Sequence, residues 1–245
     1  MGALHENLER LKERLRDAER ASSRPLGSVQ LLPVTKSADP LLTLELARAG
    51  ELELAENRVS GLEEKASHLA AEGIEVRWHF IGHLQRNKAR RVLRIARVIH
   101  SVDSLRLIES LGRIARDEEL RPAIYLEVLL TGEEEKSGLD PDEIDAALTA
   151  VAEAGCFALM GIMVMGPRDS ARTKEVFNQG ETLAQALQAA HPEAFDDGLC
   201  RLSMGMSADL ELAVQAGTSL VRVGSAFFEG VKPGNASRNS QEGAA

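Results

Sequence analysis

The sequence predicts an α/β protein that folds as a single (β/α)8 TIM barrel with an extra N-terminal helix. Eight short apolar runs alternate with helical stretches, and this pattern produces parallel strands joined by right-handed crossovers. The chain has 245 residues, close to the roughly 250 that one such barrel commonly uses. An open, doubly wound sheet shows the same alternation, but no GxGxxG motif follows the first strand to favour it.

The N-terminal segment predicts one amphipathic helix over about residues 4–20. Leucines recur there at helical spacing, at Leu4, Leu8, Leu11 and Leu15. Arg24, Pro25 and Gly27 then interrupt the pattern before the first strand.

The predicted barrel forms one domain over residues 1–231. Its strands are expected at Val29–Thr35, Leu52–Ala55, Val76–Ile81, Val98–Val102, Ala123–Leu130, Phe157–Val164, Leu199–Leu202 and Ser219–Val223. Its helices are expected around Leu41–Ala49, Gly61–Ala71, Gln85–Ala96, Leu105–Asp117, Pro141–Ala154, Thr173–Ala190 and Ala208–Ala216. Residues 232–245 are small and polar, which predicts a disordered C-terminal tail.

Composition argues against several classes of protein. The formal net charge is −9, so no basic face for nucleic acid is expected. No run approaches about 18 apolar residues, so no membrane-spanning segment is expected. Cys156 and Cys200 form no CxxC pair, and the N-terminus lacks the apolar core of a signal peptide. We therefore expect a cytoplasmic protein without a disulfide framework, acting as a monomer.

Lys36 is the first candidate site residue. The working residues of a barrel lie where strands run into the following loops, and Lys36 directly follows an apolar run. Desolvation at the barrel mouth would disfavour the ammonium form and leave an amine able to form a Schiff base. A lysine that merely extends its charged end into solvent from a strand end is the plainer interpretation.

Small-residue loops after the last two strands are the second candidate. Ser203-Met204-Gly205-Met206-Ser207 follows one strand, with Ser207 expected to cap the next helix, and Gly224-Ser225 follows the other. Loops at these two places are the recurrent phosphate site of barrels, because glycine lets backbone N–H groups approach the anion. A lysine amine and a phosphate cradle at one mouth indicate either an aldolase-type Schiff base or a pyridoxal phosphate site.

Several motifs, in order over roughly residues 28–230, resemble the pyridoxal phosphate homeostasis protein family (YggS/PROSC type). They are Val34-Thr35-Lys36, Glu56-Asn57-Arg58-Val59, Trp78-His79-Phe80-Ile81-Gly82, Leu84-Gln85-Arg86-Asn87-Lys88, Glu134-Glu135-Lys136-Ser137-Gly138, Leu202-Ser203-Met204-Gly205-Met206-Ser207 and Val221-Arg222-Val223-Gly224. The sequence departs from the family pattern at Ala55, Leu129 and Glu229, none of which falls on the lysine or the phosphate loops.

The resemblance implies a fold-type III barrel, like the N-terminal domain of alanine racemase, that binds pyridoxal 5′-phosphate (PLP). Lys36 would carry the cofactor as a Schiff base, Asn57 would line the pocket, and Arg222 would face the pyridine nitrogen. The phosphate would be held by Ser203, Gly205, Gly224 and Ser225.

The function that the resemblance implies is PLP homeostasis or carriage without a dedicated reaction, with PLP-dependent apo-enzymes as the expected partners. The alternative is a fold-type III amino-acid racemase or decarboxylase, whose acid/base tyrosine comes from a second domain. The barrel is expected to use nearly the whole chain, and the single tyrosine, Tyr125, falls within a predicted strand.

Two further groups of residues carry weaker expectations. His79 and His83 are four residues apart but lack an obvious third ligand, so no metal site is expected and His79 is interpreted as a packed residue. Lys136 lies in a Glu-rich loop and is expected to be solvated, with a secondary contact to the cofactor left open.

Overall fold

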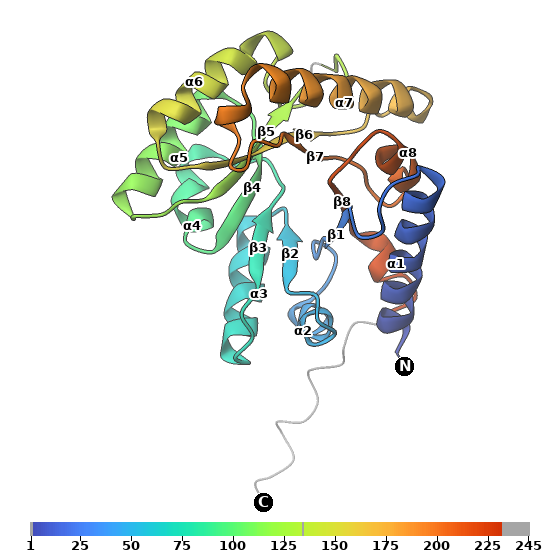
Figure 1. The fold of residues 1–245 in the computed structure, drawn as a ribbon. Coiled ribbons are helices and arrows are strands. Elements are labelled where there is room, and N and C mark those ends of the chain that lie inside the picture. The colour runs from blue at the N-terminus through green and yellow to red at the C-terminus, as the bar shows by residue number, and fades with distance from the viewer. Residues whose placement is uncertain (1, 134, 232–245) are drawn as a thin grey trace, which may run out of the picture.

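Eight parallel strands form one closed ring in the computed structural model, which describes residues 2–133 and 135–231 (Figure 1). The strands are β1 (Gln30–Pro33), β2 (Glu53–Glu56), β3 (Arg77–Phe80), β4 (Ala96–Val102), β5 (Ala123–Val128), β6 (Ala158–Val164), β7 (Arg201–Ser203) and β8 (Leu220–Val223). Their order is β1-β8-β7-β6-β5-β4-β3-β2. A parallel bridge between Val34 and Ala55 then joins β1 to β2. The closed ring confirms the predicted barrel and rules out the open sheet.

Helices surround the ring and follow the strands in alternation. They are α1 (Ala3–Ala21), α2 (Pro40–Arg48), α3 (Val59–Ala71), α4 (Ala89–Leu93), α5 (Leu105–Asp117), α6 (Ile144–Ala154), α7 (Thr173–Ala190) and α8 (Leu210–Gln215). Short 3-10 turns are η1 (Arg86–Lys88), η2 (Pro141–Glu143), η3 (Ser170–Arg172), η4 (Pro192–Ala194) and η5 (Ser225–Phe227).

The expected N-terminal helix, α1, packs beside α8 and ties the start of the chain to the end of the barrel (Figure 1). Its leucines at helical spacing are buried. Arg14 donates two hydrogen bonds of 2.6 Å to the Glu211 carboxylate. Asn7 Nδ2 donates to the backbone carbonyls of Phe227 at 3.0 Å and Glu229 at 2.9 Å. These hydrogen bonds therefore join α1 to the C-terminal end of the described chain.

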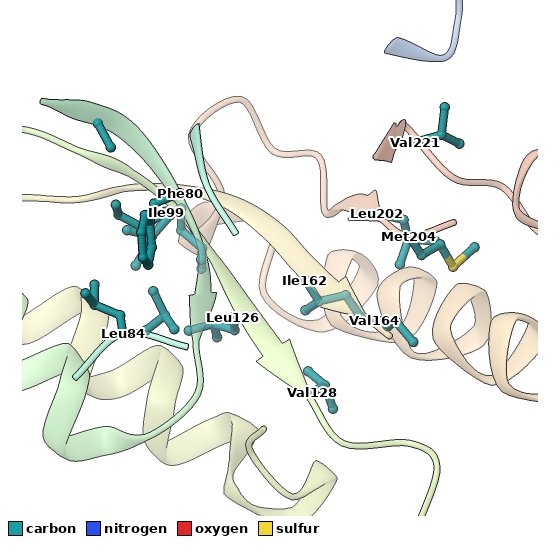
Figure 2. Packing of buried hydrophobic residues seen from close by; sticks show 14 of the residues in the cluster. Phe80, Leu84, Ile99, Leu126, Val128, Ile162, Val164, Leu202, Met204 and Val221 are labelled. Carbon is teal, nitrogen blue, oxygen red and sulfur yellow. The ribbon is translucent and has the colours of Figure 1, made fainter. Parts of the chain in front are cut away.

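The main hydrophobic core lies between the strands and the surrounding helices, where Leu126, Ile162 and Leu202 are buried together (Figure 2). Successive side chains of a strand point to opposite faces. On β5, Leu126 joins this outer core, whereas Tyr125 packs in a separate small cluster. Tyr125 and Glu127 therefore face the interior of the barrel, and that interior is where the polar side chains described below are found.

Two local predictions were wrong. The helix expected over Gln85–Ala96 is a 3-10 turn followed by the short α4, and Ala96 already belongs to β4. Ser207 does not cap the helix that follows it, because α8 begins at Leu210 and Asp209 occupies the capping position. Asp209 Oδ1 instead accepts a 2.5 Å hydrogen bond from the N–H of Met206 and so closes the preceding turn.

None of the helices described is long and apolar enough to cross a membrane. The tail expected to be disordered, residues 232–245, lies outside the described residues.

Candidate functional site

Lys36 lies in the first turn after β1, immediately beyond the bridge that closes the ring. The N–H of Thr35 donates to the Ala55 carbonyl at 2.8 Å, and Ala38 N–H donates to the Thr35 carbonyl at 2.9 Å, so the turn is anchored on both sides of the lysine. Lys36 itself is exposed, so the burial expected around its amine is not present. Its Cε lies 4.0 Å from where a Cβ on Gly224 would sit, which brings the side chain to the end of β8.

A second lysine, Lys65, fixes the backbone beside Lys36. Lys65 Nζ donates to the Thr35 carbonyl at 2.7 Å and forms an ion pair with Glu56. The other Glu56 oxygen accepts the N–H groups of Asn57 at 2.8 Å and Arg58 at 3.1 Å. Lys65 and Glu56 are 4% and 1% exposed, respectively, so both charges are buried. The ion pair therefore joins the loop that carries Lys36 to the loop that carries Asn57.

Asn57 follows β2 and has an unsatisfied polar atom. Its Oδ1 is buried and has no hydrogen-bond partner among the described residues. A Cβ on Gly82 would stand 2.0 Å from the Asn57 carbonyl oxygen, so only glycine permits this approach of the loops after β2 and β3. The close approach explains the glycine that ends the Trp-His-Phe-Ile-Gly motif.

The glycines after β7 and β8 have different structural reasons. Gly205 has a φ of +93°, and a Cβ there would stand 2.4 Å from the Ala213 Cβ of α8, so this glycine is required by the fold. At Gly224 a Cβ would be in ordinary contact with Val34, 3.5 Å from its carbonyl oxygen and 3.6 Å from its Cβ. Gly224 has a φ of −118°, so no positive φ requires glycine there. Its effect is to leave space beside Lys36, followed at once by the exposed Ser225.

Arg222 and Ser203 contact one another inside the barrel. Arg222 Nη1 donates to Ser203 Oγ at 2.7 Å and to the Ser203 carbonyl at 2.6 Å. Its Nη2 donates to the Val164 carbonyl at 3.1 Å and lies 3.2 Å from Met165 Sδ. Burial lowers the pKa of Arg222 to about 10, which leaves the guanidinium charged at neutral pH. Ser203 is fully buried and also contacts His100, so its hydroxyl is already engaged.

Two histidines and one acid near these residues were not singled out as site residues from the sequence. His79 is buried, as expected, and its Nδ1 lies 2.9 Å from Nε2 of His100. Burial lowers the pKa of both imidazoles, and in His100 the neighbouring His79 and Arg222 act in the same direction. Glu127 faces the same interior, and burial, with a smaller effect from Asp103, raises its pKa to about 7.

Lys136 is not the freely solvated residue that its loop suggested. Its Nζ donates to the Gly166 carbonyl at 2.9 Å and forms an ion pair with Glu133, and its side chain is only partly exposed. The lysine is thus held by the loop after β6. Among the residues that the structure describes, no three side chains gather in a way that could hold a metal ion.

The structure brings together most of the residues predicted from the sequence. Lys36 lies beside Gly224, Arg222 is bonded to Ser203, and Asn57 is linked to the Lys36 turn through Glu56 and Lys65. No signal in the sequence marks His100 and Glu127, because each lies in a strand whose inward and outward faces only the register defines. Lys65 lies on α3, where its spacing does not distinguish it from a solvent-exposed lysine.

Comparison with known proteins gives a consistent result. Residues 6–232 match the family model described as "Alanine racemase, N-terminal domain". The chain is 39% identical to the pyridoxal phosphate homeostasis protein of Deinococcus radiodurans over 87% of this chain and 95% of that protein. It is 32% identical to the protein of the same name from Vibrio alginolyticus, over 93% of this chain and 97% of that protein.

Solved structures agree with these relatives. PipY of Synechococcus elongatus, with PLP bound, superposes with a TM-score of 0.76 at 34% identity, covering 87% of this chain and 99% of PipY. An alanine racemase of Clostridium difficile, at 15% identity and a TM-score of 0.68, shares the fold, and the match covers 92% of this chain and 55% of the racemase. The chain belongs to the pyridoxal phosphate homeostasis protein family, within the group built on the alanine racemase N-terminal domain.

Proposed function

We propose that this protein binds PLP as a Schiff base on Lys36 and acts in intracellular PLP homeostasis or carriage rather than in catalysis. The observation that carries the proposal is the juxtaposition of Lys36 with Gly224, where the ends of β1 and β8 meet. PipY, a relative of this chain, has been solved with PLP bound. The cofactor contains an aldehyde that a lysine amine can attack and a phosphate that backbone N–H groups can hold.

The residues around Lys36 fit this cofactor. Gly205, Gly224 and Ser225 would hold the phosphate, since glycine lets the backbone come close to an anion. The unpartnered Oδ1 of Asn57 needs a donor, which a bound group would supply. Arg222 would face the pyridine nitrogen. Ser203, predicted at the phosphate, has its hydroxyl engaged by Arg222 and His100 and is better suited to holding Arg222.

The same residues disfavour a racemase or decarboxylase. When bound, PLP supplies an electron sink, and an arginine partner leaves its ring nitrogen unprotonated and weakens that sink. Tyr125 is buried in the barrel interior, where it stacks on His100 with ring centroids 4.5 Å apart. Burial raises the pKa of Tyr125 to about 12, which is poorly suited to proton transfer at neutral pH.

We also propose a cytoplasmic monomer that hands PLP to PLP-dependent apo-enzymes. A reversible Schiff base suits such a role, because it shelters a reactive aldehyde without consuming it. Transfer would be measured as activation of an apo-enzyme mixed with the loaded protein.

An absorption spectrum tests the site. Addition of PLP to the purified protein should give the long-wavelength band of a lysine Schiff base, and borohydride reduction should leave an adduct that peptide mass spectrometry maps to Lys36. Lys36→Ala should lose the band. Lys12→Ala, which removes a lysine of α1 that pairs with Glu51, should keep it. An unchanged spectrum in Lys36→Ala would refute the assignment, and steady turnover of alanine or serine would refute the carrier function.

A further inference from the structure

A continuous hydrogen-bonded chain crosses the interior of the barrel from one end to the other. Glu53 Oε2 lies 3.2 Å from His79 Nε2, and His79 Nδ1 lies 2.9 Å from His100 Nε2. His100 Nδ1 lies 2.8 Å from Ser203 Oγ, which accepts from Arg222 Nη1 at 2.7 Å. The five residues come from five different strands, β2, β3, β4, β7 and β8.

The two ends of this chain lie at opposite ends of the barrel. Glu53 is the first residue of β2, and its side chain is 36% exposed. Arg222 lies near the carboxyl end of β8, the end that carries Gly224 and adjoins Lys36. His79, His100, Ser203 and Arg222 are all buried. The chain therefore connects the candidate cofactor site to a carboxylate on the far face of the molecule.

With both imidazoles neutral, one order of protons satisfies every group in the chain. The hydrogen bond from His79 is the main cause that lowers the pKa of Glu53 to about 2, so the carboxylate is ionised and can only accept. His79 Nε2 must then carry a proton, and because burial keeps this imidazole neutral its Nδ1 must accept.

The protons of His100 and Ser203 follow in the same way. His100 Nε2 must donate to His79, so the neutral His100 presents a bare Nδ1 toward Ser203. The Ser203 hydroxyl must donate its single proton to that nitrogen. Its lone pairs then face Arg222, which has donors only. If Ser203 turned its proton toward Arg222, two donors would face each other and the guanidinium would lose a hydrogen bond.

We propose that Glu53 is a positioning residue for Arg222, acting through His79, His100 and Ser203 to fix the proton order that holds the guanidinium at the cofactor site. The part of this inference that concerns the cofactor rests on the proposed function. The part that concerns proton order stands on the hydrogen-bonded chain alone. Stacking of Tyr125 on His100, with the two rings tilted by only 18°, restrains the imidazole in the plane that the chain needs.

Nitrogen NMR of the imidazole rings tests the proton order without any cofactor. In the unliganded protein at pH 7, His79 and His100 should both be neutral Nε2–H tautomers. Glu53→Leu should convert them to mixed tautomers, and Glu53→Gln, which keeps an acceptor oxygen, should largely restore the native pattern. Arg77→Leu is the matched control, because it removes the 3.6 Å ion pair to Glu53 but leaves the contact with His79.

Titration with PLP tests the consequence at the site. Glu53→Leu should weaken PLP binding roughly tenfold, the effect of losing one hydrogen bond to a charged group, and should shift the band of the bound cofactor. Glu53→Gln and Arg77→Leu should bind nearly as the native protein does. A merely structural role for Glu53 would lower stability without changing the tautomers or the band.

The possible failures can be told apart. A charged or Nδ1–H imidazole at His79 or His100 in the native protein would overturn the proton order, even if Lys36 binds PLP and even if Glu53→Leu does not fold. Native tautomers together with unchanged PLP binding in Glu53→Leu would overturn the positioning role. Absence of a Lys36 adduct in the native protein would overturn the proposed function and, with it, the cofactor part of this inference, while the tautomer measurement would still decide the proton order.

Discussion

Two buried polar groups in this molecule are built in opposite ways. Behind the Lys36 turn, Lys65 and Glu56 bury two full charges in direct contact. Backbone N–H groups bond to the other Glu56 oxygen, and the Thr35 carbonyl accepts a second hydrogen bond from Lys65. Inside the barrel, the histidine chain keeps its charges at its two ends, Glu53 and Arg222, with neutral rings between them. The two regions therefore stabilise buried polar groups differently: one pairs opposite charges directly, and the other separates them by neutral, hydrogen-bonded rings.

Removing one member of the ion pair should have the largest effect on stability. Lys65→Met should lower the free energy of unfolding by about 3–5 kcal/mol, because the Glu56 carboxylate would remain buried without its partner. Urea unfolding measures this loss. Lys12→Met, which breaks the more exposed pair with Glu51, should cost less than about 1 kcal/mol. Equal losses in the two variants would contradict the contrast between buried and exposed pairs.

A double variant sharpens the same point. Lys65→Met combined with Glu56→Gln should regain part of the stability lost in Lys65→Met, since the uncompensated charge is gone. If the double variant loses the sum of the two single effects, the stability of this region comes from packing rather than from charge pairing.

Glu127 is a third case, an interior carboxyl that contacts no cationic side chain within residues 2–133 and 135–231. Its pKa, raised by burial and by Asp103 to about 7, lies above its unfolded value, so the stability associated with the protonated form is present at low pH and is lost as pH rises through about 7. Glu127→Gln should therefore be more stable than the native protein by about 2–3 kcal/mol at pH 8 and nearly equal to it at pH 4. Urea unfolding at the two pH values measures the difference. Glu75→Gln, on the exposed surface, should show no such pH dependence.

The neutral histidines should give the opposite pH dependence. Their pKa values are lowered by burial, so the unfolded chain takes up protons that the native protein excludes, and stability falls as pH drops below about 6.5. Each such histidine should contribute a slope of up to about 1.4 kcal/mol per pH unit. Unfolding curves between pH 7 and pH 5 in the Glu127→Gln background isolate this slope, and His100→Gln should reduce it. His5→Gln, on the exposed face of α1, should leave it unchanged.

The smallest effect on stability is expected at Gly224. A Cβ there would meet no atom closer than 3.5 Å, so Gly224→Ala should change the free energy of unfolding by no more than about 1 kcal/mol. The same Cβ would fill the space beside Lys36 and should weaken PLP binding about tenfold, as equilibrium titration would measure. Gly2→Ala, where nothing lies within 4 Å of the added carbon, is the control. Unchanged affinity in Gly224→Ala would remove the cofactor from this position.

Residues at strand ends could be predicted from the sequence, and Ser203 and Arg222 were predicted through the family resemblance. His100 and Lys65, in contrast, could not be predicted. Lys36 and Gly224 follow apolar runs, and the carboxyl ends of parallel strands meet at one edge, so their proximity follows from the fold alone. His100 lies in an apolar run, and the register of β4 with β5 shifts between Ile99 and Val102, so its inward direction has no sequence signal. Lys65 looks like any lysine on a helix until Glu56 is seen beside it. Asp209 rather than Ser207 occupies the capping position of α8, because the loop after β7 extends two residues further than expected.

Closure of the ring between β1 and β2 depends on side chains as well as on backbone pairing. In the described structure these strands share one bridge, at Val34 and Ala55, and the Lys65–Glu56 pair completes the connection just beyond it. Lys36 comes two residues after that bridge, so the position of its side chain beside Gly224 depends on the junction of β1 and β2. Variants that disrupt this junction should therefore both lower the stability of the protein and displace the Lys36 amine from Gly224.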